Sequence, residues 1–137
     1  MNKNNIRQCN LLISSTKTIY DLVGSIYCPV LKEKVIFNAR GFHHLLYNSN
    51  GSSRKINEKI YKLTLFPLAI PTIKFATAIV DERKIKIRAS RKKNLPLKLG
   101  ITYALIAKVG KKRPIDIRVI LLKIGNGKLM FRSIMRD

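Results

Sequence analysis

The two histidines of this 137-residue chain are neighbours, His43 and His44, and they are the first candidates for acid–base chemistry. Imidazole is the side chain whose unperturbed pKa suits proton transfer near neutral pH, and positive surroundings lower that pKa and keep the ring a neutral base. Adjacent helical residues point about 100° apart, so one of the two faces a given cleft. The sequence leaves open which one, and a surface histidine without a role is the alternative.

Three arginines, Arg54, Arg88 and Arg118, could hold a phosphate group through paired hydrogen bonds, whereas a lysine acts as a point charge. Tyr103 and Ser133 are expected on neighbouring parts of a sheet, where they could orient a substrate or donate a proton. Each has a structural alternative: a solvated surface charge for an arginine, packing for the tyrosine, and a hydrogen bond to a neighbour for the serine.

Several other chemistries lack a motif. The sequence has no Gly-x-x-x-x-Gly-Lys-Ser/Thr loop, no Gly-x-Gly-x-x-Gly turn and no His-Glu-x-x-His pair. Asp81 and Glu82 are sequence neighbours and need not face one another, so a two-metal nuclease built on clustered carboxylates is not expected. Cys9 and Cys28 have no metal-site or disulfide spacing and are interpreted as structural thiols. We therefore expect neither a metal nor another cofactor.

The charge balance indicates a polyanionic partner. Lys and Arg number 28 against seven acidic residues, a formal charge of +21. Residues 1–53 carry six cations and two acidic residues, which leaves 22 cations and five acidic residues for 54–137, so the basic surface belongs to the folded body. Residues 83–88 alternate charged and apolar side chains, which predicts an edge strand with a cationic outer face. The candidate RNA contacts there are Lys84, Lys86, Arg88, Arg91, Lys92 and Lys93.

The length predicts one domain, with residues 1–16 expected to be poorly ordered and 17–137 folded. Periodicity and capping signals predict, in order, a short helix over 18–26, a strand over 30–38, a short helix capped by Asn38, an amphipathic helix over 54–65 and a helix over 72–80 after Pro71. No stretch reaches the roughly 18 apolar residues of a membrane span, so a soluble cytoplasmic protein without a membrane partner is expected.

Residues 101–135 predict a three-stranded antiparallel meander around which the fold is organised. Its second turn, Asn126-Gly127, is typical of a two-residue type I′ hairpin. That loop would place Ile120 opposite Ser133, and one sheet face would carry Arg118, Ile120, Leu122, Phe131, Ser133 and Met135. The predicted fold is α+β: an N-terminal strand and two or three short helices packed on a four-stranded antiparallel sheet that ends in the Asn-Gly hairpin.

Several segments carry a family resemblance: Gly41-Phe42-His43-His44-Leu45-Leu46, Lys62-Leu63-Thr64-Leu65-Phe66-Pro67, Tyr103-Ala104-Leu105-Ile106, Ile117-Arg118-Val119-Ile120, Gly125-Asn126-Gly127-Lys128 and Phe131-Arg132-Ser133. Over about residues 28–135 the chain resembles the phage-associated branch of the barnase, EndoU, colicin and RelE-like ribonucleases. The resemblance implies a metal-independent endoribonuclease, toxin-like or effector-like, that acts on tRNA or other RNA. It also implies a neutralising acidic antitoxin or immunity protein as a partner.

Carried over by position, the resemblance assigns the catalytic roles to His44, Arg54, Tyr103, Arg118 and Ser133. The chain departs from the family pattern just before Ser133. Met130 and Arg132 stand where a histidine and an aromatic ring are expected, which removes a second proton carrier.

Two functional hypotheses follow. In the first, the histidine deprotonates a ribose 2′-OH, which attacks the adjacent phosphorus and yields a 2′,3′-cyclic phosphate. In the alternative, the protein is a non-catalytic basic domain that grips the RNA or DNA backbone. Binding to an anionic membrane surface ranks last, because no basic amphipathic helix is evident.

Overall fold

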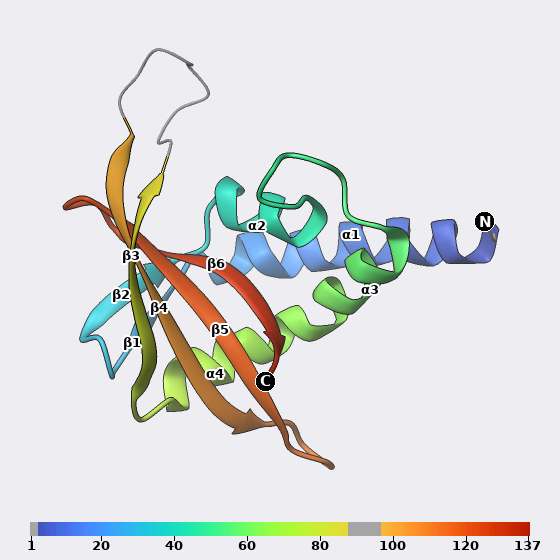
Figure 1. Cartoon of the computed structure of the whole chain (residues 1–137). Helices are drawn as coiled ribbons and strands as arrows, with labels where there is room; N and C mark the ends of the chain where they lie inside the picture. The colour runs from blue at the N-terminus through green and yellow to red at the C-terminus, as the bar shows by residue number, and fades with distance from the viewer. Residues whose placement is uncertain (1–2, 88–96) are drawn as a thin grey trace.

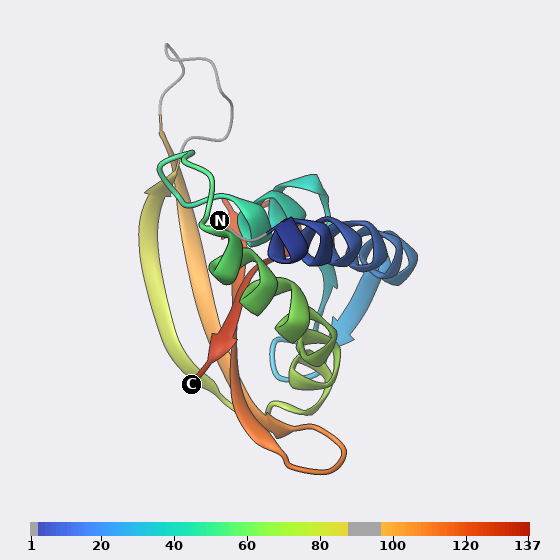
Figure 2. The ribbon, with the colours of Figure 1, turned by 90° about the vertical axis from the view of Figure 1, so that its right-hand side faces the viewer.

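Helices cover one face of a mixed β-sheet. The computed structural model describes residues 3–87 and 97–137. Within these residues it contains α1 (Lys3–Val23), β1 (Ser25–Cys28), β2 (Glu33–Ile36), α2 (Ala39–Leu46), α3 (Ile56–Leu65), the 3-10 helix η1 (Phe66–Leu68), α4 (Ala69–Phe75), β3 (Ile79–Ile87), β4 (Lys98–Val109), β5 (Ile115–Ile124) and β6 (Leu129–Arg136). Figure 1 shows how the elements are arranged, and Figure 2 shows the helices gathered on one side of β3 to β6. The predicted α+β class is confirmed.

The described strands form one sheet in the order β1-β2-β6-β5-β4-β3. The antiparallel meander is β4, β5 and β6, and β3 is an edge strand as its alternating charges predicted. The expected four-stranded antiparallel sheet is wrong in detail, because β1 and β2 add a hairpin and β2 pairs in parallel with β6. These two strands have four residues each, and a parallel contact between distant segments leaves no local sequence signal.

The pairing of β2 with β6 is short and leaves part of β6 unpaired. It covers Val35 against Leu129 and Ile36 against Met130. Beyond Met130, β6 pairs with β5 alone among the described strands, so its other edge faces α2 and α3. Backbone groups on such an edge need partners from outside the sheet.

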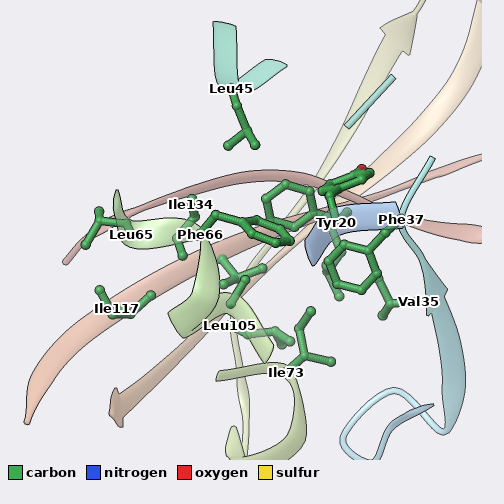
Figure 3. Packing of buried hydrophobic residues seen from close by; sticks show 14 of the residues in the cluster. Tyr20, Val35, Phe37, Leu45, Leu65, Phe66, Ile73, Leu105, Ile117 and Ile134 are labelled. Carbon is green, nitrogen blue, oxygen red and sulfur yellow. The ribbon is translucent and has the colours of Figure 1, made fainter. Parts of the chain in front are cut away.

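The core is built around an aromatic cluster on the helical face of the sheet (Figure 3). The ring of Tyr20 lies 5.5 Å from that of Phe37, 5.2 Å from that of Phe66 and 6.2 Å from that of Phe131 between centroids. Edge-to-face contacts of this kind add to the stabilisation from burial. The phenol of Tyr20 donates a hydrogen bond to the carbonyl of Asn38 at 2.6 Å, so the polar end of this buried ring is satisfied.

A long helix occupies the N-terminal segment that was predicted to be poorly ordered, and it also replaces the short helix predicted over 18–26. The fully buried residues of α1 are Cys9, Thr16 and Tyr20, which follow helical spacing. Their polar and mixed character weakened the hydrophobic period in the sequence. The helix predicted over 72–80 begins earlier and ends at Phe75, and the residues from Ile79 belong to β3.

The N-terminus of α2 follows the prediction. The side chain of Asn38 caps the helix by accepting a hydrogen bond from the backbone N–H of Gly41 at 3.1 Å. A Cβ atom at Gly41 would overlap the hydroxyl of Tyr20 and lie 2.5 Å from the carbonyl oxygen of Phe131. The glycine therefore lets α2 pack directly against the backbone of β6.

The C-terminal hairpin keeps the predicted partner of Ile120 but differs near its turn. The Gly127 N–H bonds to the Ile124 carbonyl at 2.9 Å and Gly125 has a φ of 54°, so Gly125 and Asn126 form the loop. Asn126 does not have a positive φ, which distinguishes this turn from type I′, where both loop positions need one, and favours type II′. Ser133 still pairs with Ile120, because β6 has two additional residues relative to this turn: one between Gly127 and Met130, and Arg132 at the bulge between Ile120–Ser133 and Leu121–Phe131.

The bulge changes which residues share a sheet face. Arg132 is the additional residue on β6, and Phe131 pairs with Leu121 in the core instead of joining the face of Arg118 and Ile120. Bulges commonly redirect a side chain next to a functional site. Here the redirected segment is the part of β6 that faces α2.

Candidate functional site

The polar side of α2 carries a stripe of groups suited to nucleic-acid chemistry. The opposite side of the helix is buried through Gly41, Phe42 and Leu45. Spacing of i, i+3, i+4 and i+7 places the other side chains on one face. They are Arg40, His43, His44 and Tyr47. The structure thereby distinguishes the two neighbouring histidines, which the sequence could not: His43 is exposed and His44 is half-buried.

His44 lies in a cationic cluster that keeps its imidazole neutral. Burial is the largest cause that lowers the pKa of His44, followed by the charges of Arg132, Arg40, His43 and Arg54, and together they bring this pKa to about 4. At neutral pH the ring therefore holds a lone pair that can accept a proton. The positive surroundings that the composition indicated are present around this histidine.

Arg132 is the residue of the cluster that sequence reasoning missed as a functional group. Its Nη1 is buried and has no hydrogen-bond partner within the described part of the chain. Burial lowers the pKa of its guanidinium, and the charge of Arg40 lowers it further. A buried unpaired donor next to a like charge is costly, and an anion between the two arginines would remove that cost. The sequence signal was present as a departure from the family pattern, but the bulge that redirects Arg132 was not predictable.

Arg54 supports the site through the backbone of α2. Its Nε donates to the His44 carbonyl at 3.1 Å, and its Nη1 donates to Asn48 Oδ1 at 3.0 Å and lies 3.6 Å from Glu58 Oε2. A cation at the C-terminus of a helix satisfies carbonyls that lack an intrahelical partner. Arg54 therefore holds the end of α2 in place, which is a positioning role rather than the direct phosphate clamp expected from the sequence.

Lys62 closes the open edge of β6 and brings Ser133 into the same region. Its Nζ donates to the Ile134 carbonyl at 2.6 Å and to Ser133 Oγ at 3.2 Å. Lys62 is 9 % exposed, and its pKa is lowered to about 8, chiefly by burial and then by the charge of Arg54, against an opposing effect of Glu58. The sequence gave no reason to single it out, because it lies on an otherwise ordinary amphipathic helix.

The protonation of Lys62 should make stability depend on pH. Its pKa of about 8 in the folded protein lies below the ordinary lysine pKa, so between these two values the unfolded chain binds a proton that the folded chain does not. Since the ordinary pKa of lysine is about 10.4, the free energy of unfolding should therefore rise from pH 8 to about pH 10.5, by about 3 kcal/mol for this group. Lys62→Met should lack the rise. Urea unfolding across this range measures it, with Lys55→Met, an exposed change on the same segment, as the control. Parallel pH curves for wild type and Lys62→Met would contradict the assignment.

Two of the sequence-predicted residues lie away from the cluster. Arg118 pairs with Met135 on the sheet face opposite the core residue Val119, and its Nε bonds to Asp137 Oδ1 at 3.0 Å. Tyr103 lies on β4 beside Lys123 on β5, packed against the edge of the core. The structure thus gathers His44, Arg54 and Ser133 around α2, α3 and β6. Arg118 shares the sheet face of Ser133, as predicted, but it lies on β5 with its guanidinium bonded to Asp137, and Tyr103 lies on β4.

The structure describes two of the six predicted RNA contacts. Lys84 and Lys86 are exposed on the edge strand β3, as the alternating pattern predicted. The other four candidates, Arg88, Arg91, Lys92 and Lys93, lie outside the described residues. An exposed row of cations on an edge strand can contact a phosphate backbone without reading its sequence.

Neither a metal site nor a membrane span is found in the described ranges. Residues 3–87 and 97–137 contain no group of three or more His, Cys, Asp or Glu side chains placed to hold a metal ion. No helix in the same ranges has both the length and the apolar character to cross a bilayer. In comparisons with protein families, curated proteins and solved structures, no match to this chain was found.

Proposed function

We propose that this protein is a metal-independent endoribonuclease in which His44 is the general base. The observation that carries the proposal is a neutral, half-buried imidazole close to the charge of Arg132, whose Nη1 is buried and has no hydrogen-bond partner among the described residues. The imidazole can accept a proton at neutral pH, and the guanidinium can bind an anion. Cleavage of RNA needs these two functions at one phosphate group.

The reaction would proceed through the RNA's own hydroxyl. His44 removes the proton of a ribose 2′-OH, and the oxygen attacks the adjacent phosphorus. Arg132 and Arg40 bind the non-bridging oxygens, on which negative charge grows in the transition state. The bond to the 5′-oxygen of the next nucleotide breaks, and this oxygen takes a proton from water. The products are a 2′,3′-cyclic phosphate and a 5′-hydroxyl end, and no cofactor takes part.

This assignment changes two roles that the family resemblance implied. Phosphate binding passes from Arg54 and Arg118 to Arg132, since Arg54 holds the end of α2 and the guanidinium of Arg118 is bonded to Asp137. Ser133 and Lys62 support the site by fixing the strand that carries Arg132. Tyr103 is assigned no contact with the reacting groups.

Incubation of the purified protein with single-stranded RNA in EDTA tests the proposal. We expect cleavage that EDTA does not reduce, fragments that end in 2′,3′-cyclic phosphate, and no cutting of a DNA strand of the same sequence, because DNA lacks the nucleophile. RNA binding should weaken with salt by about 0.7 log units per log unit of salt for each phosphate contacted. Cleavage of the DNA strand or a requirement for magnesium would overturn the mechanism.

A second candidate is a nucleic-acid-binding domain without catalysis. It is favoured by the exposed cations Lys84 and Lys86, which lie on β3 at the sheet edge and belong to no part of the α2 cluster. Salt-sensitive binding of both RNA and DNA with no cleavage of either would support this candidate and remove the first.

A further inference from the structure

The rings of His43 and Tyr47 form a stacked pair on the exposed side of α2. Their centroids lie 4.2 Å apart and their planes are inclined by 10°. His43 is exposed and Tyr47 is half-buried. Two flat rings in parallel contact offer a platform whose open face can receive another flat ring.

Hydrogen bonds to residues before and after the C-terminus of α2 hold the platform in place. The backbone N–H of Tyr47 bonds to the His43 carbonyl at 2.9 Å, and Tyr47 forms a β-bridge with Ser53. The next residue, Asn48, accepts a hydrogen bond from Arg54 at 3.0 Å. Anchoring of this kind reduces the conformational entropy that a ligand would otherwise have to remove.

The platform is also next to the proposed reaction centre. His43 and His44 are consecutive, and Tyr47 follows one turn after His43 on the stripe that begins at Arg40. A strand whose phosphate lies at Arg132 and Arg40 would therefore have a neighbouring base within reach of the rings. The cationic side chains would bind the backbone and the rings would stack on the base, as is usual in single-strand recognition.

We infer that the His43–Tyr47 pair is a stacking subsite for an unpaired nucleobase beside the phosphate that is cut. The inference rests on the proposed function and specifies its substrate class, which is single-stranded or looped RNA. A base inside an A-form duplex is already stacked between its neighbours, whereas an unpaired base is free to stack on an aromatic side chain.

Affinity measurements with one RNA strand, free or annealed to its complement, test the subsite. The wild-type protein should bind the free strand more tightly. Tyr47→Ala should weaken binding of the free strand by between about 5-fold and 150-fold and leave duplex binding nearly unchanged, because stacking is lost and the charges remain. Tyr47→Phe keeps the ring and should bind like the wild type. Tyr27→Ala, a change at an exposed tyrosine on β1, is the matched control and should have no effect.

Fluorescence provides a readout that does not depend on the alanine variant. The chain contains no tryptophan, so Tyr47→Trp places a single indole in the platform. A free RNA strand should quench its emission by stacking, a strand of abasic nucleotides should not, and Tyr27→Trp should respond to neither. Equal quenching by both strands, or unchanged affinity of Tyr47→Ala for the free strand, would overturn the subsite while cleavage by the wild type kept the proposed function. If the wild type neither bound nor cut RNA, both would be overturned.

Discussion

Replacing His44 by alanine should lower the rate of RNA cleavage by about 10²-fold to 10⁴-fold at saturating RNA, the usual contribution of a general base. The imidazole is the group in the cluster that is neutral at pH 7, because burial and the neighbouring arginines disfavour its charged form. RNA affinity should change little, since the arginines that hold the phosphate remain. Steady-state cleavage of a labelled RNA, together with binding measured on a strand with a blocked 2′-OH, separates the two quantities.

The pKa of His44 predicts how kcat/KM changes at acid pH. With a pKa of about 4, His44 is already a free base at pH 5, so kcat/KM should fall only when the pH approaches 4. Stability should follow a related course. The unfolded chain takes up the proton near pH 6.5 and the folded chain only near 4, so the free energy of unfolding decreases as the pH falls through this window, and His44→Ala should lack this decrease.

His43→Ala is the matched control for His44→Ala. It removes the neighbouring imidazole, which is exposed and contributes to the stacked pair, so it should weaken RNA binding but leave the rate at saturating RNA close to that of the wild type. Equal losses of that rate in both variants would contradict the assignment of the base to His44.

The parts of the fold that could be predicted from sequence are those fixed by local rules. Asn38 caps α2 because its side chain can reach the first free N–H groups of a helix, and the alternating charges of β3 identify an edge strand because one face must be solvated. In each case the information lies within a few residues along the chain.

The parts that could not be predicted depend on contacts between distant segments. The turn lies one residue earlier than predicted, and two additional residues on β6, one between Gly127 and Met130 and one at the Arg132 bulge, restore the Ile120–Ser133 pair. Lys62 is buried because β6 has an unpaired edge, which follows from the short parallel contact with β2. The histidine and the positive charge of the candidate site could be proposed from sequence, but Arg132, to which we assign phosphate binding, and the buried Lys62 required the tertiary structure.

Replacing Arg132 by methionine should reduce activity and increase stability at the same time. Methionine fills a similar volume without a charge, so the variant removes a half-buried guanidinium with a buried, unpaired Nη1 from near Arg40 and His44. Exchange of buried ionic groups for apolar side chains of similar volume is often neutral or stabilises by about 1–4 kcal/mol, and here the removed charge has like-charged neighbours. Loss of one donor to the transition-state oxygens typically lowers the rate by about 10²-fold to 10³-fold. A gain in stability together with a loss of activity is expected where a protein keeps an energetically unfavourable group for its function.

Two further measurements separate this account of Arg132 from a merely structural one. The pKa of His44 should rise in Arg132→Met, because Arg132 is the largest charge that lowers it, so the acid limb of the pH–rate profile should move to higher pH. Arg118→Met is the matched control, since it removes an arginine that is paired with Asp137. It should leave both the rate and the acid limb unchanged. A lower stability of Arg132→Met than of the wild type would contradict this account of Arg132. An equal loss of activity in Arg118→Met would mean that the phosphate binds elsewhere, and the role that the family resemblance gave to Arg118 would regain its support.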